Sequence, residues 1–274
     1  MYKLLCVDLD GTLLNDLKDI DEINIEALKK VYKSGIIVAL TTGRLFSSAA
    51  VYSEKIGFKF PLICSNGALI IEAGWNKALF KKELSIINCK KIISLLKKFN
   101  VTIVFNSSNI VFSDKEGYSV KIFNKLNENL PWDKKIKIVL VSDWDLIFNE
   151  YENEILKCII TEDELDKVSE IKKALKEIDG LEVVNSSLNS VEVMTKGVSK
   201  GQAVELLAKR YNISKDKIAS IGDSENDISM FKASGVSIAM GNSLAYVKEI
   251  ADYVTETNEN KGLAKAIDRY ILNN

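Results

Sequence analysis

The sequence contains no histidine among its 274 residues. This absence excludes a Ser-His-Asp triad, phosphohistidine chemistry and every metal site that depends on imidazole. Histidine is the side chain that most often transfers protons near neutral pH, so the carboxylates become the first candidates for acid and base catalysis. Any chemistry that the chain performs must use carboxylates, lysine, hydroxyls, thiols or a bound cation.

Cysteine is also scarce, and its spacing fits neither a disulfide framework nor a zinc site. The four cysteines are Cys6, Cys64, Cys89 and Cys158, with no CxxC pair among them. Three of them stand in apolar, strand-like runs, so we expect them to be small buried hydrophobic residues. No cysteine is followed six positions later by arginine, as a cysteine phosphatase requires, and no GxxxxGK[ST] stretch indicates a P-loop enzyme.

Long apolar runs and a strong net charge are missing as well. No segment approaches the roughly 18 apolar residues of a membrane span, and no basic stretch with a following apolar run and cleavage site opens the sequence. The net charge of −1 gives no general attraction to nucleic acid or to anionic membranes. We therefore expect a cytoplasmic protein that binds neither nucleic acid nor membranes.

The sequence does contain a regular alternation of buried strands and helices. Apolar runs of strand length stand at 4–7, 36–40, 62–64, 218–221 and 236–239. Segments with helical spacing separate these runs, which predicts an α/β fold with a Rossmann-like parallel sheet and helices on both faces.

The middle of the chain departs from this alternation. Residues 84–189 show an α+β pattern that is long enough for a domain of its own, preceded by a predicted hairpin at 68–83. Thr161 and Glu164 are expected to cap a helix within it. We thus predict a discontinuous core formed by residues 1–83 and 190–274, with an inserted α+β domain at 84–189.

The first apolar run ends at two acidic residues and a glycine, Asp8, Asp10 and Gly11. In an extended strand, residues two apart project to the same side, and like charges so close are costly unless a cation or a shared proton relieves them. Carboxylate oxygens without imidazole or thiolate suit Mg²⁺. The alternative is a plain turn in which Asp10 caps the residues that follow it.

Two further strands end in polar clusters, Thr42 with Gly43 and the acidic stretch from Asp223 to Asp227. The carboxyl ends of parallel strands share one edge of a sheet, so these clusters are expected to meet Asp8 in one pocket. Each cluster also has a structural alternative, because hydroxyls and acids commonly cap the start of a helix.

Lys200 breaks a local rule. It follows Ser199, which with Gln202 predicts a helix start, and the dipole disfavours a cation in the first helical turn. An anion held near that helix start would reverse the effect, which favours a functional role. The alternative is a solvated surface lysine.

Four stretches of the sequence together carry a resemblance to a known family: DLDGTL at 8–13, TTGR at 41–44, SKG at 199–201 and GDSENDISM at 222–230. In this order they resemble the four motifs of the haloacid dehalogenase-like phosphatases. The large α+β insert between the second and third motifs resembles the Cof-type subgroup, whose class IIB cap selects the substrate.

The resemblance implies a role for each matching residue. Asp8 would be the nucleophile that forms an aspartyl phosphate, and Asp10 would act as acid and then base. The phosphate-binding residues would be Thr42, Gly43, Lys200 and Asn226. Mg²⁺ would be held by Asp8, the carbonyl of Asp10 and Asp223, with Asp227 supporting them.

We therefore expect a monomeric enzyme that hydrolyses small phosphorylated metabolites, either sugar phosphates or phosphorylated cofactors, with Mg²⁺ as cofactor. Two alternatives stay open. A phosphomutase would return the phosphoryl group to a sugar, and a non-catalytic sensor would only bind a sugar phosphate. Intact catalytic positions argue against the sensor, whereas the motifs do not separate hydrolase from mutase.

Overall fold

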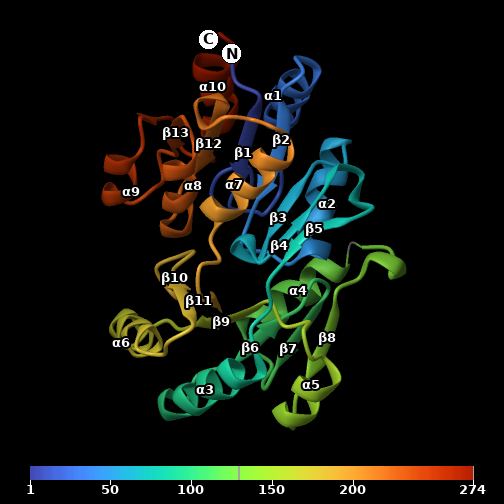
Figure 1. The fold of residues 1–274 in the computed structure, drawn as a ribbon, viewed down its shortest axis with the longest axis vertical. Coiled ribbons are helices and arrows are strands. Elements are labelled where there is room, and N and C mark those ends of the chain that lie inside the picture. Colours follow the sequence, from blue (N-terminus) through green and yellow to red (C-terminus); the bar gives the residue numbers. More distant parts are fainter. Residues whose placement is uncertain (129, 274) are drawn as a thin grey trace. The chain divides into compact units, whose positions relative to one another are not determined.

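Residues 1–128 and 130–273 are described by a computed structural model (Figure 1). Contacts divide the chain into two units, each described here by itself. The first comprises Met1–Gly43, Ala49–Phe80 and Ser199–Asn274, and the second comprises Arg44–Ser48 and Lys81–Val198. Among the described residues, no helix is long and apolar enough to cross a membrane.

The larger sheet has the strand order β14-β13-β12-β1-β2-β3-β4-β5 over the described residues. Its strands are β1 (Leu4–Asp8), β2 (Ile37–Thr41), β3 (Leu62–Cys64), β4 (Leu69–Ile71), β5 (Ala78–Lys81), β12 (Ile218–Gly222), β13 (Val236–Ala239) and β14 (Tyr253–Val254). The pairs from β14 to β3 are parallel, which confirms the predicted α/β class. The sheet is nevertheless mixed, because β4 of the predicted hairpin pairs antiparallel with β3.

Strand β1 lies in the middle of this sheet and is completely apolar until its last residue. Cys6 lies between Ser220 of β12 and Ala39 of β2. Leu4 and Cys6 belong to the buried cluster that also holds side chains of helices α7 (Lys200–Arg210) and α8 (Ile228–Ala233). Because side chains alternate along a strand, Asp8 continues the same side as Leu4 and Cys6, toward the helix that begins at Lys200.

The other helices of the first unit are α1 (Glu22–Lys33), most of α2 (Phe46–Ile56), α9 (Ala245–Ile250) and α10 (Gly262–Ala266), which continues as a π-helix at Ile267–Leu272. Helices α1 and α10 come from opposite ends of the chain and lie side by side (Figure 1). Helix α1 turns Ile25, Leu28 and Val31 inward, at the spacing of an amphipathic helix.

The second unit contains a sheet of order β10-β11-β9-β6-β7-β8. Its strands are β6 (Val104–Asn106), β7 (Ile110–Ser113), β8 (Lys137–Leu140), β9 (Lys157–Thr161), β10 (Leu181–Val184) and β11 (Ser190–Thr195), and its helices are α3 (Ile86–Leu96), α4 (Tyr118–Glu128), α5 (Trp144–Glu150) and α6 (Leu165–Lys176). Strand β11 pairs with both β9 and β10, so this unit extends beyond the predicted boundary at residue 190.

Two local features of the second unit differ from expectation. Helix α5 was not predicted, although Asp143 caps it by accepting hydrogen bonds from the backbone N–H groups of Asp145 and Leu146. The predicted cap of α6 by Thr161 is wrong, because the N-cap residue is Glu164, and the nearby N–H groups are bound by Glu162. The expected state of the cysteines is confirmed, since all four are buried and unpaired.

Candidate active site

Three neighbouring strands of the larger sheet end at the same edge. Asp8, the last residue of β1, lies opposite Thr41, the last residue of β2. On the other side, Val7 lies opposite Ile221, so that β12 ends at Gly222 beside Asp8. The parallel register therefore brings three of the four sequence motifs to one place, where open α/β sheets bind their ligands.

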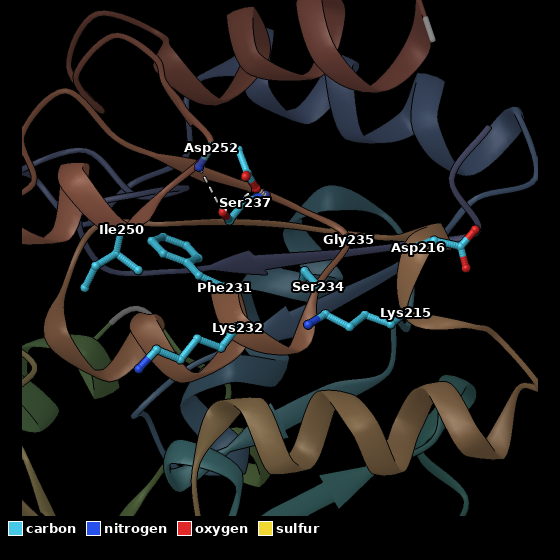
Figure 2. Close-up of a pocket in the computed structure, with 9 residues that line it drawn as sticks. All are labelled: Lys215, Asp216, Phe231, Lys232, Ser234, Gly235, Ser237, Ile250 and Asp252. Atoms are coloured by element: carbon cyan, nitrogen blue, oxygen red, sulfur yellow. Dashed lines mark hydrogen bonds between the residues drawn. The ribbon is translucent and has the colours of Figure 1, made fainter.

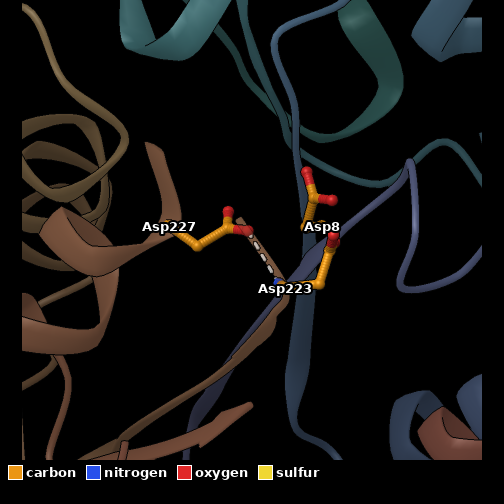
Figure 3. A group of neighbouring side chains, drawn as sticks. All are labelled: Asp8, Asp223 and Asp227. Atoms are coloured by element: carbon orange, nitrogen blue, oxygen red, sulfur yellow. Dashed lines mark hydrogen bonds between the residues drawn. The ribbon is translucent and has the colours of Figure 1, made fainter. Parts of the chain in front are cut away.

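Three carboxylates meet at this edge, those of Asp8, Asp223 and Asp227 (Figure 3). One oxygen from each lies within 4.8 Å of the others. Asp8 and Asp227 are only 4% and 0% exposed, whereas Asp223 is partly buried. Burying like charges this closely is unfavourable without a compensating cation.

Lys200 supplies one positive charge to the cluster. Its Nζ donates to Asp8 Oδ1 and to Asp227 Oδ1, both at 2.6 Å, and its side chain is 1% exposed. The helix that it opens is capped by Ser199, whose hydroxyl accepts from the N–H of Gln202 at 3.1 Å. Lys200 is therefore no solvated surface lysine, and the two carboxylates explain a cation in the first helical turn.

The ionisation of these groups is strongly perturbed. Burial raises the pKa of Asp8 well above its ordinary value, and Asp227 and Asp223 raise it further, while Lys200 opposes them. Burial together with the charge of Asp227 raises the pKa of Asp223 to about 7. Burial lowers the pKa of Lys200, but the two carboxylates outweigh that effect, so its pKa is raised. Burial and mutual repulsion thus disfavour the charged forms of Asp8 and Asp223.

Asp227 links the other members of the cluster through hydrogen bonds. Its Oδ2 accepts from the backbone N–H groups of Asp223 and Ser224, both at 2.9 Å, while its Oδ1 accepts from Lys200. Gly222 makes this possible, because a Cβ there would lie 2.5 Å from the carboxyl carbon of Asp227. Both oxygens of Asp227 thus accept hydrogen bonds from the protein.

The Asp223 carboxylate contacts a residue of the N-terminal motif, Thr12. Its Oδ1 accepts from the hydroxyl of Thr12 at 2.9 Å, and its Oδ2 accepts from the hydroxyl of Ser224 at 2.8 Å. Gly11 adopts φ +78°, and a Cβ there would lie 2.5 Å from the Asp223 carboxylate. Thr12 was not predicted as a site residue, although its place in DLDGTL could have indicated it.

Asp10 does not belong to the group of three carboxylates. Strand β1 ends at Asp8 and the chain then turns through Leu9, so Asp10 does not continue the extended strand on which our expectation for its side chain rested. The Asp10 side chain is 39% exposed and lies 3.0 Å from Lys18 Nζ. The Asp10 side chain is therefore partly accessible to solvent.

Thr42 and Asn226 are linked through Asn66, which was not predicted as a site residue. The N–H of Asn66 donates to the carbonyl of Thr42 at 3.0 Å, and Asn226 Nδ2 donates to Asn66 Oδ1 at 3.1 Å. All three residues are buried. Gly43 is partly buried and precedes α2, which begins at Phe46, so the loop at Thr42 and Gly43 stands just before the helix.

The donor set fits a divalent cation with a preference for oxygen. Three carboxylates and one ammonium leave two negative charges when all are ionised. No hydrogen bond to Asp8 Oδ2 comes from the described residues, and Asn226 Oδ1 is buried without a partner among them. Carboxylate oxygens without histidine or thiolate are the ligands of Mg²⁺ rather than of zinc or copper.

A surface cavity of about 580 Å³ lies elsewhere in the first unit (Figure 2). It is lined by residues such as Lys215, Asp216, Gly235 and Asp252, which precede strands β12, β13 and β14. Ser237 and Asp252, which also line it, hydrogen-bond to each other. The cavity therefore stands at the amino ends of these strands, the edge opposite to the carboxylates, and it contains none of the predicted site residues.

The sequence and fold match known proteins over nearly the whole chain. A model of the haloacid dehalogenase-like hydrolases matches residues 5–267. The 5-amino-6-(5-phospho-D-ribitylamino)uracil phosphatase YcsE of Bacillus subtilis is 30% identical over 270 residues, covering 98% of this chain and 96% of its own. The pyridoxal phosphate phosphatase YbhA of Escherichia coli is 25% identical over 271 residues, covering 98% and 99%.

Solved structures show the same similarity. A haloacid dehalogenase-like hydrolase from B. subtilis superposes with a TM-score of 0.87 at 26% identity, covering 98% of this chain and 100% of its own. The match includes residues of both units, so the inserted α+β part is shared together with the parallel sheet.

Proposed function

The chain belongs to the haloacid dehalogenase-like hydrolase family, and we propose that it hydrolyses small phosphate monoesters through a phosphorylated Asp8. The observation that carries this proposal is the contact of the Lys200 ammonium with the buried carboxylate of Asp8 at 2.6 Å. Phosphoryl transfer needs an in-line nucleophile and positive charge around the transferred group, and this pair supplies both.

Asp8 suits the role of nucleophile. Lys200 binds its Oδ1, and no hydrogen bond from the described residues occupies its Oδ2. We assign the attack on phosphorus to Oδ2, while Lys200 keeps the carboxylate oriented and lowers the repulsion between two anions. The phosphoryl oxygens would be held by Lys200, the hydroxyl of Thr42, the N–H groups near Gly43 and the amide of Asn226.

Asp10 suits the transfer of protons. Asp10 follows the nucleophile Asp8 by two positions in the sequence. Its side chain is partly exposed and does not belong to the buried cluster of carboxylates. In the first half of the reaction it would protonate the leaving alcohol, and in the second half it would take a proton from the water that attacks the phosphorylated Asp8. The acid Asp10 is partly exposed whereas the nucleophile Asp8 is buried, and such different environments allow two carboxylates to take different roles.

We propose Mg²⁺ as the cofactor, held by Asp8, the carbonyl of Asp10 and Asp223, with Asp227 fixing the loop that carries Asp223. When bound, the ion neutralises charge on the phosphoryl group and on the nucleophile. Thr12 and Ser224 orient the Asp223 carboxylate for that purpose through its two oxygens.

We assign the choice of substrate to the inserted part of the chain, predicted at 84–189. The names of the relatives support small phosphorylated metabolites, one being a phosphatase of a phosphoribitylamino uracil and another of pyridoxal phosphate. Phosphate esters of ribityl or sugar groups and of pyridoxal are therefore the first compounds to screen against the purified protein.

Phosphate release from p-nitrophenyl phosphate tests the proposal. The parent protein should release phosphate with Mg²⁺ present and lose this activity in excess chelator. Asp8→Asn should be inactive while its circular dichroism spectrum and melting temperature show a folded protein. Hydrolysis by Asp8→Asn at the parental rate would overturn the assignment of the nucleophile. Full activity in chelator would overturn the assignment of the metal.

A further inference from the structure

The turn after β3, formed by Ser65, Asn66 and Gly67, has an unusual backbone. All three residues have positive φ angles, of 49°, 56° and 101°. Ser65 and Asn66 are 0% and 1% exposed. Residues other than glycine rarely adopt this left-handed backbone conformation. A buried run of such residues persists only where the surrounding structure holds it in place.

Asn66 joins two separate segments of the proposed phosphate site. Its backbone N–H donates to the carbonyl of Thr42 at 3.0 Å, and its side-chain Oδ1 accepts from Asn226 Nδ2 at 3.1 Å. Asn226 stands 160 positions further along the chain. One residue therefore fixes the loop after β2 by its backbone and the acidic loop after β12 by its side chain.

Gly67 brings the same turn against a third segment. A Cβ on Gly67 would collide with the backbone carbonyl of Ser199, the residue before Lys200. With φ +101° and this close approach, only glycine fits the position. The turn thus contacts the segments that carry Thr42, Lys200 and Asn226, all within the first unit.

We propose that Asn66 is a positioning residue for phosphoryl transfer, which acts by orienting the amide of Asn226. This inference rests on the proposed function. An amide nitrogen carries two hydrogens, so the bond to Asn66 leaves one for a phosphoryl oxygen. Asn226 Oδ1 is buried without a partner among the described residues, so the hydrogen bond from Asn226 Nδ2 to Asn66 Oδ1 sets the orientation of this amide.

A purely structural turn would behave differently from a positioning residue. If Asn66 only stabilises the backbone, its loss lowers the amount of folded protein and leaves the affinity of the folded fraction for ligands unchanged. If it orients Asn226, its loss weakens the binding of a mimic of the transferred phosphoryl group, because a misplaced group contributes less in the transition state.

The experiment compares Asn66→Gly, Asn226→Ala and the double variant with the parent protein. Glycine at 66 tolerates the positive φ and keeps the N–H bond to Thr42, so it removes the side chain alone. Asn212→Gly is the matched control, since Asn212 is an exposed asparagine of the first unit with φ +54°. For each protein, kcat/KM with p-nitrophenyl phosphate and the inhibition constant of orthovanadate are measured with Mg²⁺ present, alongside the melting temperature.

We expect Asn66→Gly to lower kcat/KM about tenfold and to raise the vanadate inhibition constant by a similar factor, as for one misdirected polar contact. Asn226→Ala should cost at least as much, and the double variant should be no worse than Asn226→Ala. Asn212→Gly should match the parent.

Two results would overturn the proposal: effects of Asn66→Gly and Asn226→Ala that multiply in the double variant, or a parental vanadate inhibition constant in Asn66→Gly. If Asn66→Gly does not fold, Asn66→Ala, which also removes the acceptor oxygen, takes its place, and its inhibition constant decides between the same outcomes. Activity that survives Asp8→Asn would instead refute the proposed function, so the two failures are distinguishable.

Discussion

Lys200 Nζ donates to Asp8 Oδ1 at 2.6 Å, and both side chains are almost completely buried. The bond connects the first strand of the chain with a helix that begins 192 positions later. The same ammonium binds Asp227, so two buried carboxylates share one cation. Removing that cation leaves buried charges without compensation, which is far more costly than losing an ion pair at the surface.

Lys200→Met is therefore expected to lower the free energy of unfolding by about 3 kcal/mol in chelator, because two buried carboxylates lose their partner. It should also abolish most phosphatase activity. Urea unfolding measures the first effect. Lys196→Met is the control, since Lys196 and its partner Asp179 are 67% and 92% exposed, and its urea midpoint should not change. Equal stability of Lys200→Met and the parent would contradict the geometry of the cluster.

Asp223→Asn should distinguish the effect of the Asp223 charge on stability from its effect on Mg²⁺ binding. Burial and Asp227 raise the pKa of Asp223 to about 7, which reflects the cost of its charge in the absence of a cation. In chelator, the variant should melt at or above the temperature of the parent. Millimolar Mg²⁺ should raise the melting temperature of the parent but not that of Asp223→Asn. An equal rise in both would place the cation elsewhere.

Gly11→Ala tests the close approach between the first motif and Asp223. A Cβ at this position would lie 2.5 Å from Asp223 Oδ2, whereas Gly35, with φ +83°, has open space around it. Gly35→Ala should cost about 1 kcal/mol of stability for its left-handed backbone and keep full activity. Gly11→Ala should additionally displace Asp223 and lose most Mg²⁺-dependent activity. A parental kcat/KM in Gly11→Ala would show that activity does not depend on the position of the Asp223 carboxylate.

Asp10 and Lys18 form a pair whose side chains are 39% and 50% exposed. Surface pairs of this kind contribute little, so Lys18→Met should keep kcat within about twofold of the parent. Asp10→Asn should lower kcat by a factor of about 100 or more, because the proposed acid and base is lost. The ratio of the two kcat values is the measurement. Equal kcat values would exclude Asp10 from proton transfer.

The strand ends could be predicted from the sequence because each signal is local. Leu4 to Val7 form an apolar run that stops at Asp8, and a parallel arrangement follows from the alternation of such runs with helices. The same local reasoning could have found α5. Trp144, Ile147 and Phe148 have helical spacing and follow the capping residue Asp143, but the helix has only seven residues.

The contacts within the site could not be predicted in this way. Thr12 binds Asp223 across 211 positions, and Asn66 binds Asn226 across 160. The residues around Thr12 and Asn66 in the sequence give no indication of these distant partners. The path of the chain after Asp8 could not be predicted either. A strand of five residues that ends at Asp8 gives no sign, in sequence alone, of where the following turn sends the next acid.

The phosphorylation of Asp8 itself is the most direct test of the account. Asp10→Asn should slow the hydrolysis of the phosphorylated enzyme, so acid quenching during turnover should trap it. Trypsin cleaves after Lys3 and Lys18, and mass spectrometry of residues 4–18 should then show one added phosphoryl group on Asp8. The double variant Asp8→Asn with Asp10→Asn should show none. A phosphoryl group on another residue, or its persistence in the double variant, would contradict the central claim.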